Sequence, residues 1–143
     1  MRVLVTGGAG FIGSNFVRAW VARHPGDAIV VLDALTYAGN RSSLDDVGDR
    51  FSFVEADIAD LDAVSRVLED HAVDVVVNFA AESHNSLAVL DPGRFFRTNV
   101  LGTQSLLEAA RRHGVVRFHH ISTCEVYGDL ALDSAERFTE ESP

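Results

Sequence analysis

The chain has 143 residues, the size of one domain, and 47% of them are hydrophobic, which is enough for a buried core. It carries 21 acidic and 12 basic residues, a net charge of −9, and shows no basic patch of the kind that nucleic-acid-binding domains use. Nucleic acid is therefore not an expected partner. The sequence contains no run of about 18 apolar residues, so no membrane span is expected. The first expected strand begins at Arg2, so we expect no signal peptide. The single cysteine, Cys124, has no partner for an internal disulfide. Both observations lead us to expect a cytoplasmic protein.

Short apolar runs alternate along the chain with amphipathic stretches. The expected strands are 2–6, 28–32, 51–55, 73–79 and 116–121. The expected helices are 12–23, a short one at 42–47, 61–71, a short one within 80–91 and a long one at 93–113, before a loop from Ser122 to Pro143. Strands that are apolar along their whole length belong to sheets covered on both faces. The pattern therefore predicts one doubly wound α/β domain with a parallel sheet, a Rossmann fold, over residues 1–143.

Three glycines follow the first expected strand at three-residue spacing, at positions Gly7, Gly10 and Gly13. In a dinucleotide-binding loop, Gly7 would allow the sharp turn, Gly10 would let a pyrophosphate approach the backbone, and Gly13 would let the next helix pack closely on the sheet. The amino end of that helix would then face the phosphates. A glycine motif alone is weak evidence, and a plain glycine-rich turn is the alternative.

Asp33 follows the second expected strand, 20 residues beyond Gly13. A carboxylate at this spacing accepts hydrogen bonds from the adenosine ribose hydroxyls of a dinucleotide, and it repels a 2′-phosphate. The two signals together predict NAD as the cofactor in preference to NADP. The alternative is that Asp33 only caps the turn that follows it.

Longer segments resemble the nucleotide-sugar 4,6-dehydratases, above all the dTDP-glucose 4,6-dehydratases, within the extended short-chain dehydrogenase/reductase family. The specific ones are 33–40 (DALTYAGN) and 120–129 (HISTCEVYGD). Segments 78–84 (NFAAESH) and 98–103 (TNVLGT) also match, whereas the glycine loop is shared by many families. The resemblance covers essentially the whole chain.

This resemblance implies a set of contacts with NAD and with a nucleotide sugar. The glycine loop and the backbone of Phe11 and Ile12 would hold the pyrophosphate. The other implied NAD contacts are Asp33, Thr36 and Gly39 at the adenosine ribose, Asp57 and Ile58 at the adenine, and Phe79, Ala80, Ala81, Glu82, Asn99 and Ser122 along the rest of the cofactor. Ser83 and His84 would begin the substrate side.

The family reaction is an internal redox cycle. Hydride leaves carbon 4 of the hexose for NAD, the resulting ketone acidifies the proton on carbon 5, water leaves from carbon 6, and the hydride returns to carbon 6. The resemblance implies that Glu125 is the base at carbon 5 and that Thr123 hydrogen-bonds the sugar. The cofactor carries the hydride, and the protein supplies position and proton transfer.

Cys124 departs from the family pattern, in which an aspartic acid at this position protonates the hydroxyl that leaves carbon 6. A thiol keeps its proton at neutral pH, so Cys124 could still donate it, although a thiol is a weak hydrogen-bond donor. The alternative is that Cys124 is a small residue without a chemical role. In that case the chain belongs to an epimerase or decarboxylase relative, or to a dehydratase with an altered elimination step.

A second departure is the lack of the Tyr-x-x-x-Lys pair that the oxidation at carbon 4 requires. The lysine of that pair lowers the pKa of the tyrosine by its nearby charge. This chain has no lysine, and its tyrosines are Tyr37 and Tyr127. In the family the pair follows shortly after a stretch like 138–143 (FTEESP). We therefore expect the chain to be a piece of a longer enzyme, inactive alone, that lacks the sugar-binding domain.

Two other functions remain open. A nucleotide-sugar 4-epimerase or decarboxylase would use the same cofactor, but an epimerase needs no base at carbon 5, so Glu125 favours the dehydratase. A non-catalytic NAD-binding domain would explain the missing pair, but it has no use for Thr123 and Glu125. No metal site is expected, because no Cys/His spacing resembles a zinc site. A hydrolase is disfavoured because the nucleophile elbow is absent.

Family members are usually homodimers whose long helices form a four-helix bundle. The expected helix at 93–113 offers a face for such a contact, made of Phe95, Val100, Leu106, Leu107 and Ala110. Ordinary core packing of the same residues is the alternative.

Overall fold

A computed structural model of the chain describes residues 1–142, with Asn85 through its backbone alone. Five parallel strands form one sheet in the order β3-β2-β1-β4-β5. The strands are β1 (Arg2–Thr6), β2 (Ala28–Asp33), β3 (Phe51–Glu55), β4 (Val75–Asn78) and β5 (Arg117–His120). The helices are α1 (Phe11–Arg23), η1 (Arg41–Val47), α2 (Leu61–Asp70), α3 (Asn85–Leu90), α4 (Pro92–Phe95), η2 (Phe96–Gly102), α5 (Thr103–Arg112) and η3 (Cys124–Tyr127).

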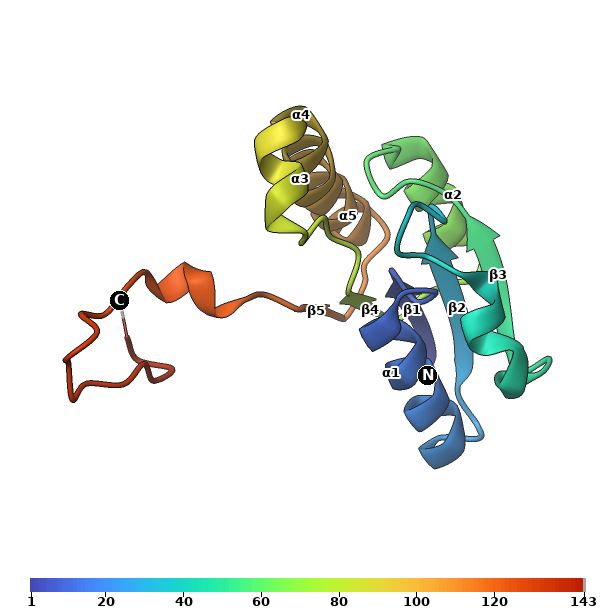
Figure 1. Cartoon of the computed structure of the whole chain (residues 1–143). Helices are drawn as coiled ribbons and strands as arrows, with labels where there is room; N and C mark the ends of the chain where they lie inside the picture. Colours follow the sequence, from blue (N-terminus) through green and yellow to red (C-terminus); the bar gives the residue numbers. More distant parts are fainter. Residues whose placement is uncertain (143) are drawn as a thin grey trace.

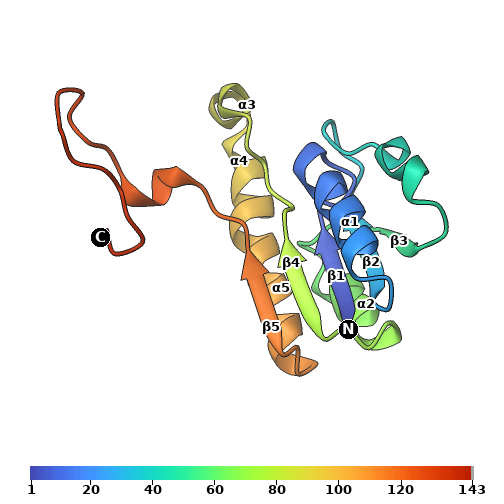
Figure 2. The same cartoon turned by 90° about the horizontal axis from the view of Figure 1, so that it is seen from below.

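Helices cover both faces of this sheet (Figures 1 and 2). On one face, α2 and α5 pack over a core that contains Leu4, Val76 and Leu106. On the other face, α1 and η1 pack over a core that contains Val5 and Val31. The central strands β1 and β2 are buried on both faces, as their continuous apolar sequences predict. The doubly wound parallel sheet expected from the sequence is thus confirmed.

Sequence order reverses next to β1. The chain passes from β1 outward to β2 and β3, then returns to β4 on the other side of β1. In sheets of this kind the crevice for a dinucleotide lies at the carboxyl ends of the strands on either side of that reversal. The fold therefore marks the carboxyl ends of β1 and β4 as the place to look for a site.

The long helix expected at 93–113 is continuous but not uniform. It begins at Pro92, where the Asp91 side chain accepts a hydrogen bond from the backbone of Arg94, and its middle section η2 is a π-helix. Such wide turns often occur at functional positions. Gly102, at the end of η2, lies so close to Ile58 that a Cβ would come within 2.6 Å of its side chain.

Residues beyond β5 leave the body of the domain as an arm (Figures 1 and 2). The sequence predicts only loop here, yet residues Cys124–Tyr127 form a turn of 3₁₀ helix. Tyr127 stacks on Phe138 with ring centroids 5.4 Å apart. The last residue of the expected loop, Pro143, lies outside the described residues.

We expect Leu106→Ala to lower the free energy of unfolding by about 2–5 kcal/mol, because the Leu106 side chain on α5 is fully buried in the core against the sheet and its truncation leaves a cavity. Val116→Ala is the control, since that side chain is 85% exposed, and it should change stability by less than about 0.5 kcal/mol. Urea unfolding of the purified variants measures both. Equal losses would contradict the placement of Leu106 in the core.

Candidate functional site

The predicted site residues follow all five strands, and their segments start from one edge of the sheet. The glycine loop follows β1, Asp33 ends β2, Asp57 and Ile58 follow β3, residues 79–84 follow β4, and residues 122–125 follow β5. Because all the strands are parallel, their carboxyl ends lie along the same edge. The segments that carry the predicted site residues, from Gly7 to Glu125, therefore all start from this edge.

The glycine loop is held by close backbone contacts. Gly7 adopts a φ of +65°, and its carbonyl accepts a hydrogen bond from Gly10 at 3.1 Å. A Cβ on Gly13 would come within 2.2 Å of that same carbonyl oxygen. The turn at Gly7 and the close packing at Gly13 are therefore those that the spacing predicts, and neither position has room for a larger residue.

The amino end of α1 has no side-chain cap. Gly10 stands at the cap position without a hydrogen-bonding side chain, and Phe11 and Ile12 are 85% and 63% exposed. The first amides of a helix have no partner within the helix, and together with the helix dipole they attract anions. Next to a glycine loop, this bare end suits a pyrophosphate.

Asp33 joins the glycine loop to the loop after β2. Its side chain is buried, Oδ2 accepts a hydrogen bond from the backbone of Ala9 at 2.9 Å, and Oδ1 accepts one from Leu35 at 2.9 Å. Each carboxylate oxygen has a second acceptor position, so a ribose hydroxyl can still bind. Gly39 lies against Oδ1, and its backbone donates to the carbonyl of Thr36 at 3.2 Å. The predicted ribose residues are thus neighbours.

Residues 79–84 are fixed to the π-helix by a pair of hydrogen bonds. The backbone N–H of Glu82 donates to Oδ1 of Asn99 at 2.8 Å, and Nδ2 of Asn99 donates back to the carbonyl of Glu82 at 2.8 Å. The Glu82 side chain is 4% exposed, and its Oε1 accepts from Nε of Arg94 at 2.6 Å. Two residues predicted separately as cofactor contacts, Glu82 and Asn99, therefore act as one unit.

The predicted adenine contacts lie beside the same helix. Asp57 accepts from Nη2 of Arg97 at 2.9 Å, and Ile58 is buried against Gly102. Ser83 and His84 are exposed at the start of α3, which His84 caps without a side-chain hydrogen bond. Both pairs of residues lie on loops that follow strands, Asp57 and Ile58 after β3 and Ser83 and His84 after β4.

A series of side-chain hydrogen bonds that the sequence did not predict links Thr6, Asn78 and His120 across three strands. The Thr6 hydroxyl donates to Oδ1 of Asn78, both residues are fully buried, and Nδ2 of Asn78 lies 3.0 Å from Nδ1 of His120. The available signal was a polar residue ending each of three neighbouring strands.

The predicted catalytic residues stand on the arm. Thr123, Cys124 and Glu125 are exposed, and Sγ of Cys124 lies 3.8 Å from Oε2 of Glu125. The Thr123 hydroxyl, followed by the backbone and the Cys124 thiol, lowers the pKa of Glu125, so the carboxylate is in its basic form. Within residues 1–142 no hydrogen bond or ion pair joins residues 122–125 to the glycine loop or to residues 79–84.

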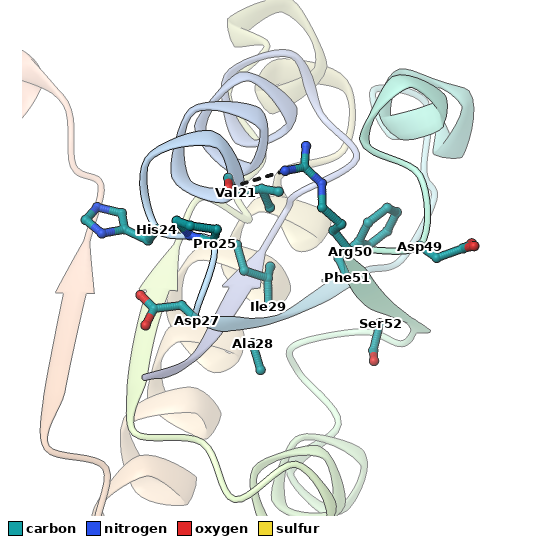
Figure 3. A pocket seen from close by; sticks show the side chains of 10 residues that line it. All are labelled: Val21, His24, Pro25, Asp27, Ala28, Ile29, Asp49, Arg50, Phe51 and Ser52. Carbon is teal, nitrogen blue, oxygen red and sulfur yellow. Dashed lines mark hydrogen bonds between the residues drawn. The ribbon is translucent and has the colours of Figure 1, made fainter.

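A pocket of about 340 Å³ lies at the opposite edge of the sheet (Figure 3). Its lining includes His24, Ile29 and Phe51, and Arg50 reaches the carbonyl of Val21 at 3.5 Å. None of the predicted site residues contributes to it. The part of the chain that the structure describes holds no group of three metal-ligating side chains and no helix of the length and hydrophobicity that spanning a bilayer requires.

Comparison with known proteins agrees with this architecture. A profile of the NAD dependent epimerase/dehydratase family matches residues 3–143. The chain is 59% identical, over all 143 residues, to a dTDP-glucose 4,6-dehydratase of Mycobacterium tuberculosis, and it spans 42% of that protein's length.

Solved structures show the same relationship. DesIV, a dTDP-glucose 4,6-dehydratase from Streptomyces venezuelae crystallised with NAD and TYD bound, matches the whole chain with a TM-score of 0.90 and 48% identity, and 45% of DesIV is covered. A UDP-glucose 4-epimerase from Thermus thermophilus in complex with NAD matches with a TM-score of 0.88 and 38% identity, and 44% of it is covered. The chain therefore belongs to the NAD dependent epimerase/dehydratase family.

Proposed function

We propose that the protein to which this chain belongs is an NAD-dependent dTDP-glucose 4,6-dehydratase, a lyase. The observation that carries the proposal is that the carboxyl edge of the sheet bears the glycine loop, joined to Asp33, and that the segment leaving this edge after β5 carries Thr123 and Glu125. Sequence identity of 59% to a dTDP-glucose 4,6-dehydratase supports the choice of substrate. Glu125 favours dehydration over epimerisation, because only the former needs a base at carbon 5.

The residues at the carboxyl edge fit NAD. The bare end of α1 and the glycine loop can hold its pyrophosphate, and Asp33 can accept from its adenosine ribose while repelling a 2′-phosphate. Thr36 and Gly39 would line that ribose, Asp57 and Ile58 the adenine, and residues 79–82 with Asn99 and Ser122 the rest of the cofactor. When bound, NAD supplies a hydride acceptor for carbon 4 and a donor for carbon 6.

The protein's own residues would move protons and hold the sugar. Glu125, kept as a carboxylate by its lowered pKa, takes the proton from carbon 5. Thr123 hydrogen-bonds the sugar, and Ser83 with His84 begins the substrate side. Cys124 stands where the family has the acid that protonates the leaving hydroxyl. Its thiol can donate a proton, but more weakly than a carboxylic acid.

Several properties of the complete protein follow from this proposal. Of the predicted dimer face, Val100 and Leu107 are exposed and line a shallow apolar hollow that offers a homodimer contact, whereas Leu106 and Ala110 are buried in the domain and cannot take part. We expect a cytoplasmic enzyme. Residues 1–143 alone should bind NAD but not turn over substrate, because the Tyr-x-x-x-Lys pair is absent from them.

Turnover of dTDP-glucose by the natural full-length protein tests the proposal directly. With substrate deuterated at carbon 4, we expect a product lighter by one water whose deuterium lies at carbon 6, measured by mass spectrometry and NMR. UDP-glucose serves as the parallel substrate. Unchanged mass with inversion at carbon 4 would instead identify an epimerase, and loss of carbon dioxide from a nucleotide uronate would identify a decarboxylase.

Replacing Asp33 tests the choice of cofactor. We expect Asp33→Asn to weaken NAD binding by about tenfold or more, because the amide nitrogen cannot accept the hydrogen bonds that the carboxylate accepts. Affinity for NADP should fall less or rise, since the repulsion of the 2′-phosphate is gone. Isothermal titration with both cofactors measures this, with Asp62→Asn on the exposed face of α2 as control. An equal loss for NAD and NADP would count against the assignment.

Replacing Cys124 tests the elimination step. We expect Cys124→Asp to raise the rate of water loss by about tenfold or more, because a carboxylic acid is the better proton donor at carbon 6. Cys124→Ser is the matched control and should give no increase. Single-turnover mass spectrometry of the sugar follows the step. An unchanged or slower loss of water in Cys124→Asp would refute a chemical role for this position.

A further inference from the structure

Two residues that the sequence analysis left without a role, Tyr37 and Arg94, meet above the candidate cofactor site. The guanidinium of Arg94 lies over the ring of Tyr37, 5.1 Å from its centroid. The same guanidinium donates through Nε to Oε1 of Glu82 at 2.6 Å. Stacking of a cation on an aromatic ring and an ion pair to a buried carboxylate both stabilise this arrangement.

The contact between Tyr37, Arg94 and Glu82 spans the carboxyl end of β1. Tyr37 lies on the loop after β2, and Glu82 lies on the loop after β4. Strand β1 runs between β2 and β4, so the Tyr37–Arg94–Glu82 contact bridges the carboxyl end of β1. That is the point of sequence reversal, across which dinucleotides lie in folds of this type.

Glu82 has acceptor capacity that the structure leaves unused. Its side chain is 4% exposed, yet Oε2 accepts no hydrogen bond from any residue that the structure describes. A buried acceptor without a donor is destabilising, so such an atom in a folded protein calls for an explanation. Burial, and after it the nearby Glu82 carboxylate, raise the pKa of Tyr37, so its phenol remains a protonated donor.

Hydrogen bonds hold the two loops at the ends of the bridge. On one side, the backbone of Asn40 donates to the carbonyl of Ala9 at 3.1 Å, which ties the Tyr37 loop to the glycine loop. On the other side, Asn99 clamps the backbone of Glu82. Tyr37 itself is 54% exposed, and its phenol lies near the Glu82 carboxylate, which contributes to raising its pKa.

We propose that Tyr37 and Arg94 form a strap that closes over the bound dinucleotide and slows its release, with the Tyr37 hydroxyl donating to Oε2 of Glu82 in the closed state. This inference rests on the proposed function, because it takes NAD as the ligand under the strap. It makes Tyr37 and Arg94 positioning residues for the cofactor, and it gives Oε2 of Glu82 its donor. A cofactor that is regenerated in each cycle gains from such retention.

The dissociation rate of NAD from the natural full-length protein tests the strap. Protein loaded with labelled NAD is chased with excess unlabelled NAD, and the release is followed over time. We expect Tyr37→Phe, which keeps the ring over Arg94 but removes the hydroxyl, to speed release about fivefold, the effect of one hydrogen bond. Arg94→Gln should speed it by at least as much, and Arg94→Lys should recover part of the retention.

Stability and a remote control separate retention from folding. Tyr37→Phe keeps the ring contact with Arg94, so it should change the thermal midpoint of the cofactor-free protein far less than Arg94→Gln does. Arg2→Gln removes another arginine–carboxylate pair, with Asp74 at 2.7 Å on the far edge of the sheet, and should leave release unchanged. Release from Tyr37→Phe as slow as from the unaltered protein would overturn the strap and leave the proposed function standing. An unaltered protein that binds no NAD would overturn both.

Discussion

The carboxylate of Asp33 is the interaction on which the arrangement of the site depends. By accepting hydrogen bonds from Ala9 and Leu35, it joins the glycine loop after β1 to the loop after β2 in one buried contact. A buried carboxylate must be compensated by donors, and here the backbone supplies them. The same group is then held in a fixed orientation, so that it can meet a ribose without reorganising.

Other hydrogen bonds fix neighbouring segments along the same edge of the sheet. The Thr6–Asn78–His120 chain crosses three neighbouring strands, and the Asn99 clamp attaches residues 79–84 to the π-helix. Buried polar groups that are fully paired make a core more specific, whereas unpaired ones weaken it. Oε2 of Glu82 is an exception, because it is buried without a hydrogen-bond partner among residues 1–142, and Tyr37 and Arg94 are the side chains beside it.

The sequence was informative where a single local pattern decides the structure. Apolar runs located all five strands to within two residues, and glycine spacing located the turn at Gly7 and the close packing at Gly13. It failed where the outcome depends on contacts between distant segments. No periodicity distinguishes the π-helix from an α-helix, and nothing in the segment around Tyr37 indicates that Arg94 lies over its ring. The catalytic roles of Thr123, Cys124 and Glu125 remain predictions.

A crystal structure of the natural full-length protein with NAD would test the central claim most directly, which is that the carboxyl ends of β1 and β4 form a dinucleotide site organised by Asp33. The account predicts the pyrophosphate at the amino end of α1 and the adenosine ribose within hydrogen-bond distance of Asp33. A dinucleotide bound elsewhere, for example in the pocket beside Arg50 at the opposite edge, would contradict it.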